Sequence, residues 1–447
     1  MYQNVPVAQL EAQLAQSGRL YLGAGNTIIE RALRLRSGAV IAGAERDMTR
    51  LINQTAAQPW GDSATVQALQ GHEFGIGYVD AFQREHGTGL AVLESLEAAT
   101  HYPPGTICWT WPWTDTGVRV GPSTRHVVVT RDGAKLALDP LPKRASNAIC
   151  WTRDSLALTR CTAGELSVVA DLPAPTTLIG QVVLISDGMQ VANEPRGKLR
   201  RVVAVRDRRV FLDRPLQRHD YKKGQCVLAP VNVIHGVTIR DMTIAAGPSG
   251  WSFYGKFLYG LRFERCRFTG TLEINQSAYV SLLDCHGAHL KLNCTHNVQV
   301  QGGTWQRVSL EECCADVTLA GVRSGQIVTD PHQACERIAV RDSLIAGVAA
   351  DQSPIALEGR GCVIERVQID CGRGSGHVYL TGADVGMLDV ASSRGLVFRG
   401  GVRQYAQRCK APGISLGWTE GGQSEGVAVA LDTQQVTNMD GRWVIVN

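Results

Sequence analysis

The chain has 447 residues, of which 44% are hydrophobic and 19% charged, and its formal net charge at pH 7 is +4. This composition excludes an intrinsically disordered chain, and the small net charge gives no electrostatic basis for nucleic-acid binding. No apolar run approaches the ~20 residues that span a bilayer, so a membrane protein is not expected.

The N-terminal segment and the cysteines indicate the folding environment. The first 18 residues contain no basic segment followed by an apolar core, so no signal peptide is expected. The 13 cysteines follow no framework spacing and are expected to be buried thiols rather than disulfide partners. Both features favour folding in a reducing cytosol.

Residues 18–52 read GRLYLGAGNTIIERALRLRSGAVIAGAERDMTRLI and carry a pattern of glycines and alternating apolar residues. The pattern positions are Gly23, Gly25, Leu33, Leu35, Ser37, Gly43, Thr49 and Leu51. This segment resembles the opening of the pectate-lyase-like superfamily of right-handed parallel β-helices, although the upstream G-D-G element of that family is missing and Ala44–Glu45 replaces its second glycine. The resemblance implies an all-β solenoid with a short N-terminal helix, and we assign residues 1–55 to that helix and the first coils.

Residues 56–163 are less regular and are expected to be an elaborated part of the same β-helix. A helix is predicted over residues 80–102, before the aromatic segment CWTWPWTDTG. In that segment Trp109, Trp111 and Trp113 alternate, so an extended strand would place all three on one face. Such a face suits either stacking on sugar rings or a subunit interface.

Residues 164–232 contain short alternating segments joined by the turn RDRR, which predicts a small β-barrel-like insert. From residue 233 to 447 a short apolar alternation recurs every 18 to 24 residues. Its first column is Val237, Leu261, Val280, Val298, Val317, Ile338, Cys362 and Val385. A second column, half a period away, is Leu272, Leu290, Val308, Ile327, Ile355 and Val378. Two alternating strands per period predict a coiled parallel β-solenoid, because a β-sandwich does not require like positions to recur in register.

Three carboxylates occupy the outward position that follows the second column on successive predicted coils: Glu311, Asp330 and Glu358. Neighbouring coils lie ~4.8 Å apart, so these groups could serve as the acid, base or nucleophile of a glycosidase. The alternatives are a calcium ion held by the same three residues, or side chains that splay apart into water. Asn293 holds the equivalent position one coil before Glu311.

Other polar residues of the repeat carry weaker signals. Trp251 and Tyr254 are expected in a loop between strands, where recognition residues concentrate. Glu273 and Lys291 are expected to form an exposed ion pair without a functional role. The segment DCHGAHLKLNCTH invites a zinc interpretation, but its spacing matches no standard zinc pattern, and Cys285 is expected to pack inward.

The resemblance also implies a function. Phage tail spikes and related virion proteins often carry this domain, as do bacterial polysaccharide lyases and hydrolases. The leading hypothesis is therefore a homotrimeric tail spike that recognises, and in some cases degrades, a bacterial surface polysaccharide. It would be made in the host cytoplasm and attached to a virion tail or baseplate. The alternatives are a stand-alone polysaccharide lyase or hydrolase, secreted by a route not visible in the sequence, and a non-enzymatic structural virion component. No cofactor is expected beyond the calcium alternative.

Overall fold

The computed structural model describes residues 2–54, 64, 66–69, 79–85, 88–93, 104–105, 107–110, 124–139, 156–191, 194–216, 226–311, 314–329, 335–351, 355–357, 363–370, 377–392, 395–407 and 435–436. They form two compact units: Met1–Leu69 together with Ile234–Asn447, and Gln70–Val233.

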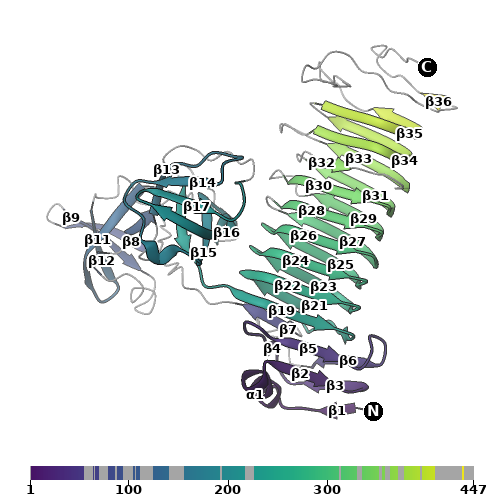
Figure 1. Cartoon of the computed structure of the whole chain (residues 1–447), viewed down its shortest axis with the longest axis horizontal. Coiled ribbons are helices and arrows are strands. Elements are labelled where there is room, and N and C mark those ends of the chain that lie inside the picture. The colour runs from purple at the N-terminus through teal and green to yellow at the C-terminus, as the bar shows by residue number, and fades with distance from the viewer. Residues whose placement is uncertain are drawn as a thin grey trace. The chain divides into compact units, whose positions relative to one another are not determined.

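The first unit is a parallel β-solenoid of about 12 turns (Figure 1), which confirms the predicted fold class. Sheet B contains β2 (Arg19–Leu22), β5 (Val40–Gly43), β19 (Ile234–Arg240), β22 (Leu258–Glu264), β24 (Ala278–Leu283), β26 (His296–Gln301), β28 (Ala315–Ala320) and β30 (Glu336–Arg341). Sheet A contains β1 (Tyr2–Asn4), β3 (Gly25–Ile29), β4 (Leu33–Arg34), β6 (Thr49–Asn53), β7 (Val66–Leu69), β20 (Thr243–Ile244), β21 (Trp251–Lys256), β23 (Arg267–Asn275), β25 (His286–Asn293), β27 (Thr304–Glu311), β29 (Arg323–Thr329), β31 (Leu344–Asp351), β32 (Ile355–Leu357), β33 (Val363–Asp370), β34 (His377–Ser392), β35 (Gly395–Gln407) and β36 (Gln435–Val436). Each strand therefore stacks on the corresponding strand of an adjacent coil.

The predicted columns are confirmed through the middle of the solenoid. In sheet B the parallel register runs through Val237, Leu261, Val280, Val298, Val317 and Ile338. In sheet A it runs through Leu272, Leu290, Val308 and Ile327. All ten side chains are buried in one continuous core, because alternation directs every second residue inward.

Beyond residue 340 the two predicted columns no longer follow the two sheets, although the predicted alignment of Ile355 with Val378 is confirmed. Val348 lies opposite Ile327, at the position predicted for Ile355. Val385, predicted for the first column, pairs with Ile364 in sheet A. Both sheets present the same alternation, so the pattern cannot tell which sheet a strand joins once the loop lengths change.

Six coils turn from sheet B into sheet A at a residue with left-handed backbone. These corner residues are Asp241, Arg265, Asp284, Gly302, Gly321 and Asp342, with φ between 48° and 69°. Their amides continue the stack: the N–H of Asp284, for example, donates to the carbonyl of Gln301 one coil on, at 2.8 Å. Glycine and aspartate, which occupy five of the six corners, tolerate this conformation best.

Helix α1 (Val7–Ser17) packs on the first coils through Val7 and Leu10, which belong to the same buried core. The carboxylate of Glu30 accepts a hydrogen bond from the Val7 amide at 3.0 Å, and Gly18 ends the helix in left-handed conformation. In the described part of the chain no helix is long and apolar enough to cross a membrane.

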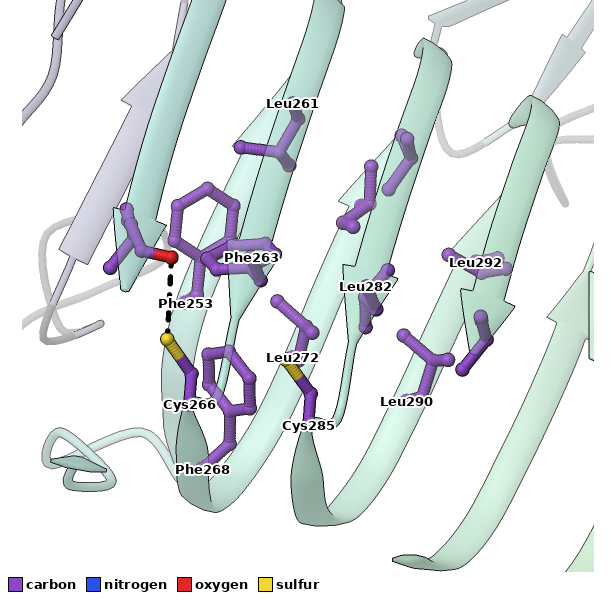
Figure 2. Packing of buried hydrophobic residues seen from close by; sticks show 14 of the residues in the cluster. Phe253, Leu261, Phe263, Cys266, Phe268, Leu272, Leu282, Cys285, Leu290 and Leu292 are labelled. Carbon is purple, nitrogen blue, oxygen red and sulfur yellow. Dashed lines mark hydrogen bonds between the residues drawn. The ribbon is translucent and has the colours of Figure 1, made fainter. Parts of the chain in front are cut away.

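Aromatic rings and thiols fill the core between the two sheets (Figure 2). The ring of Phe263 meets those of Phe253 and Phe268 edge-on, with centroids 5.0 and 5.1 Å apart. Cys266 and Cys285 are fully buried and free, which confirms the inward packing predicted for Cys285.

The second unit contains an antiparallel sheet and a closed barrel. The sheet is formed by β8 (Val79–Glu85), β9 (Thr88–Leu93), β10 (Ile107–Thr110), β11 (Thr124–Asp132) and β12 (Lys135–Asp139). The barrel contains β13 (Leu156–Arg160), β14 (Ser167–Ala170), β15 (Val182–Val191), β16 (Glu194–Arg206), β17 (Arg209–Leu212) and β18 (Val227–Pro230), with the short 3₁₀ helix η1 (Thr176–Leu178).

The helix predicted over residues 80–102 is wrong, because β8 and β9 form an antiparallel hairpin there. Gly89 inside the second strand disfavours a continuous helix. The sequence-based domain boundaries stay predictions.

Candidate functional site

The outward face of sheet A carries a cluster of polar and aromatic side chains on four successive strands, β21, β23, β25 and β27. We call it the lateral cluster. It consists of Trp251, Tyr254, Glu273, Asn275, His289, Lys291, Asn293, Arg307, Ser309 and Glu311. These residues alternate with core residues such as Leu272 and Leu290, so the repeat that builds the core also builds the cluster.

The register arranges the cluster in three rows that run across the coils. The first row is Trp251, Thr271, His289, Arg307 and Gln326. The second is Tyr254, Glu273, Lys291 and Ser309. The third is Lys256, Asn275, Asn293 and Glu311. Neighbours within a row are one coil apart, about 4.8 Å.

Trp251 and Tyr254 form the aromatic end of the cluster, and hydrogen bonds connect both to the region around Glu273. Oε2 of Glu273 accepts a hydrogen bond from the indole Nε1 of Trp251 at 2.9 Å, and its Oε1 accepts one from Nδ2 of Asn275 at 3.1 Å. The same Nδ2 lies 3.1 Å from the hydroxyl of Tyr254, and the rings of Trp251 and Tyr254 lie 5.8 Å apart. Glu273 is only 5% exposed, so these bonds fix both aromatic rings against a buried carboxylate.

Lys291 links two carboxylates of the cluster. Its Nζ lies 3.6 Å from Glu273 Oε1 and 3.2 Å from Glu311 Oε2. Burial alone lowers the pKa of Lys291, but the attraction of the two carboxylates outweighs it, and the pKa is raised above its ordinary value. The ammonium group therefore stays charged and neutralises part of the local acidity.

His289 and Arg307 form the basic end of the cluster, and both contact the hydroxyl of Ser309. Oγ of Ser309 lies 2.8 Å from His289 Nε2 and accepts a hydrogen bond from Arg307 Nε at 3.2 Å. Burial, Arg307 and Lys291 lower the pKa of His289 from 6.5 to about 4, so its imidazole is neutral at pH 7.

Two amide oxygens of the third row are buried and have no hydrogen-bond donor within the described ranges of the chain. Oδ1 of Asn275 and Oδ1 of Asn293 are buried, and neither accepts a hydrogen bond from any residue that the structure describes. They are neighbours in the parallel register. An unsatisfied buried acceptor is unfavourable by itself, and a donor from a bound water molecule or ligand would satisfy it.

Of the residues predicted from the sequence, four lie in the lateral cluster: Trp251, Tyr254, Asn293 and Glu311. Trp251 and Tyr254 belong to strand β21, so their assignment to a loop is wrong. Trp109 lies in β10 of the second unit. Asp330, Glu358, Trp111 and Trp113 lie outside the described residues.

The cluster also contains residues for which the sequence pattern predicted no functional role. The pairing of Glu273 with Lys291 is confirmed, but Glu273 is buried rather than exposed. Arg307 and Ser309 were not singled out, although both lie in register with His289 and Lys291 on the preceding coil. Following each outward row as well as each core column through the repeat would have found them.

The structure offers no direct support for the metal alternatives. Among the described residues, no group of three or more His, Cys, Asp or Glu side chains is arranged to hold a metal ion. The calcium alternative includes Asp330 and Glu358 and stays a prediction.

The fold and the cluster together define a parallel β-solenoid with a polar and aromatic lateral surface. No protein-family model and no curated protein sequence matches the chain. Similar solved structures include the tailspike gp61 of Pseudomonas phage phi297, with 10% identity, 92% of this chain and 74% of that chain covered, and a TM-score of 0.38. The tailspike gp49 of Pseudomonas phage LKA1 shows 10% identity, coverage of 96% and 71%, and a TM-score of 0.36.

A third similar structure is the Gp54 tailspike of Acinetobacter baumannii bacteriophage AP22 in complex with A. baumannii capsular saccharide. It shows 10% identity, coverage of 93% of this chain and 72% of that chain, and a TM-score of 0.40. Alignments at this level assign neither residues nor function to this chain.

Proposed function

We propose that the chain is a receptor-binding protein of the tail-spike type, which recognises a bacterial surface polysaccharide through the lateral cluster. The observation that carries the proposal is the aromatic end of the cluster, where Glu273 holds the indole of Trp251 beside the ring of Tyr254. A sugar ring presents an apolar face and a rim of hydroxyl groups. Fixed aromatic rings beside hydrogen-bonding groups offer a complementary surface.

Binding to an array of purified capsular polysaccharides and lipopolysaccharide O-chains tests the proposal. The wild-type chain is expected to bind at least one of them, and Trp251→Ala is expected to lose that binding. Tyr21→Ala is the matched control, because Tyr21 is an aromatic residue of the same solenoid, 65% exposed and outside the cluster. No binding by the wild type to any member of the array contradicts the proposal.

The assembly proposed with this function is a homotrimer on a virion tail or baseplate, made in the host cytoplasm. Trimer formation would protect lateral surfaces and strand edges of the solenoid. Native mass spectrometry is expected to give three times the 48.3 kDa of the chain. A stable monomer counts against the tail-spike assembly and favours a stand-alone polysaccharide lyase or hydrolase instead.

Depolymerase activity is the second candidate function. Glu311 contributes a carboxylate to the lateral cluster, and together with Asp330 and Glu358 it is proposed as acid, base or nucleophile. Release of oligosaccharides from a bound polysaccharide, followed by size-exclusion chromatography, tests this function. If Glu311→Gln leaves the release unchanged, Glu311 is not a catalytic residue.

A further inference from the structure

The first row of the cluster changes in character along its length. It begins at Trp251, passes Thr271 and the neutral imidazole of His289, and reaches the guanidinium of Arg307. At about 4.8 Å per coil, Arg307 lies three coils and roughly 14 Å from the aromatic end. A polymer lying across the coils would therefore contact an aromatic ring and a cation at different points.

Arg307 is held in place without being neutralised. It is exposed, and its Nε donates to Oγ of Ser309, a residue only 2% exposed. No carboxylate of a described residue lies within ion-pair distance of its guanidinium. Because only Nε takes part in this bond, the N–H groups of Nη1 and Nη2 can donate to an anion.

Among the described residues, the side chains in register with Arg307 carry no negative charge. Its neighbours in the first row are the neutral side chains of His289 and Gln326. The nearby carboxylates Glu273 and Glu311 are both engaged by Lys291. Burial is the largest cause of the low pKa of His289, and the positive charges of Arg307 and Lys291 lower it further.

We propose that Arg307, oriented by Ser309 and flanked by His289, is a subsite for the carboxylate of an acidic sugar, so that the lateral cluster selects polysaccharides that contain uronic-acid-type residues. A guanidinium fork matches a carboxylate in two parallel hydrogen bonds, which gives this contact directional specificity. The inference rests on the proposed function, because it names the chemical class that the same surface binds.

The same polysaccharide array tests the inference when its members are sorted by carboxylate content. The bound polysaccharides are expected to be acidic, and chemical reduction of their carboxyl groups to alcohols is expected to weaken binding. By calorimetry, Arg307→Gln should weaken binding of an acidic polysaccharide about 10- to 100-fold, because a charge-assisted contact is lost. Arg307→Lys keeps the charge without the fork and is expected to give an intermediate affinity.

Arg240→Gln is the control, since it removes the same charge from an exposed arginine of sheet B. If the wild type binds only neutral polysaccharides, or if Arg307→Gln and Arg240→Gln bind an acidic one equally well, the subsite is wrong while the proposed function stands. If the wild type binds nothing, the proposed function itself fails.

Discussion

Trp251 and Glu273 lie 22 residues apart, yet the indole Nε1 of one donates a 2.9 Å hydrogen bond to Oε2 of the other. The bond forms because β21 and β23 are parallel neighbours in sheet A. It ties the orientation of an aromatic ring on the surface to a buried carboxylate. The aromatic end of the lateral cluster is thus preorganised by the stacking of the coils.

Two substitutions of Trp251 should distinguish the contribution of its aromatic ring to polysaccharide binding from that of its hydrogen bond to Glu273. Trp251→Phe keeps an aromatic face but removes the Nε1 donor, and we expect polysaccharide affinity between those of the wild type and Trp251→Ala. Calorimetric titration with a polysaccharide that the wild type binds measures both variants. Equal affinity of Trp251→Ala and the wild type would remove this ring from the binding surface.

Removal of the cation between the two carboxylates should destabilise the chain. Lys291→Gln leaves the buried carboxylate of Glu273 without its charged partner, and the free energy of unfolding should fall by about 1–3 kcal/mol. Glu311→Gln removes only a partly exposed partner of the same lysine and should cost less than about 1 kcal/mol. Urea denaturation of both variants measures the difference, and a larger effect for Glu311→Gln contradicts this account.

His289 should make stability depend on pH. Its pKa is about 4 in the folded chain and 6.5 when unperturbed, so the unfolded chain binds more protons between these values. The contribution of His289 to the free energy of unfolding is therefore complete above pH 6.5 and is lost as the pH falls towards 4. After allowance for solvent around the half-buried ring, the change is about 1–2 kcal/mol.

Titration of the imidazole by NMR measures this pKa directly. Arg307→Gln removes a positive neighbour and should raise the pKa of His289, whereas Arg240→Gln on sheet B should leave it unchanged. In His289→Gln, the rise in stability between pH 4 and 6.5 should be smaller than in the wild type. A wild-type His289 pKa near 6.5 contradicts the prediction.

Gly287 is needed for the packing of the core. A Cβ at this position would lie 2.5 Å from Cζ3 of Trp305, a fully buried ring that stacks on Phe268. Gly287→Ala should therefore destabilise the chain by about 1–3 kcal/mol through overpacking. Gly23→Ala is the control, because its Cβ would meet nothing within 4 Å. Thermal denaturation compares the two, and equal melting temperatures would show that Trp305 can move aside.

The core was easier to predict from the sequence than the lateral cluster, because core positions repeat the same apolar character from coil to coil and outward positions do not. Leu261 and Val280 share a chemical character that recurs at a regular spacing, so the column is visible in the sequence. Glu273 and Lys291 also occupy equivalent positions, but outward positions differ in character from coil to coil. The role of an outward residue depends on the neighbour that covers it. Trp251 covers Glu273 from strand β21, where the sequence pattern predicted a loop.

The sequence by itself determined the solenoid, because the periodic apolar residues can be buried together only when coils stack in register. It also placed Glu311 and Asn293 among the outward residues, whereas it predicted a loop for Trp251 and Tyr254, which lie in strand β21. The tertiary structure decided which strands pair beyond residue 340, since both sheets have the same alternation. It also decided the chemistry of the lateral cluster: burial, cross-coil hydrogen bonds and the spacing of charges arise only when residues about 20 positions apart are brought to about 4.8 Å.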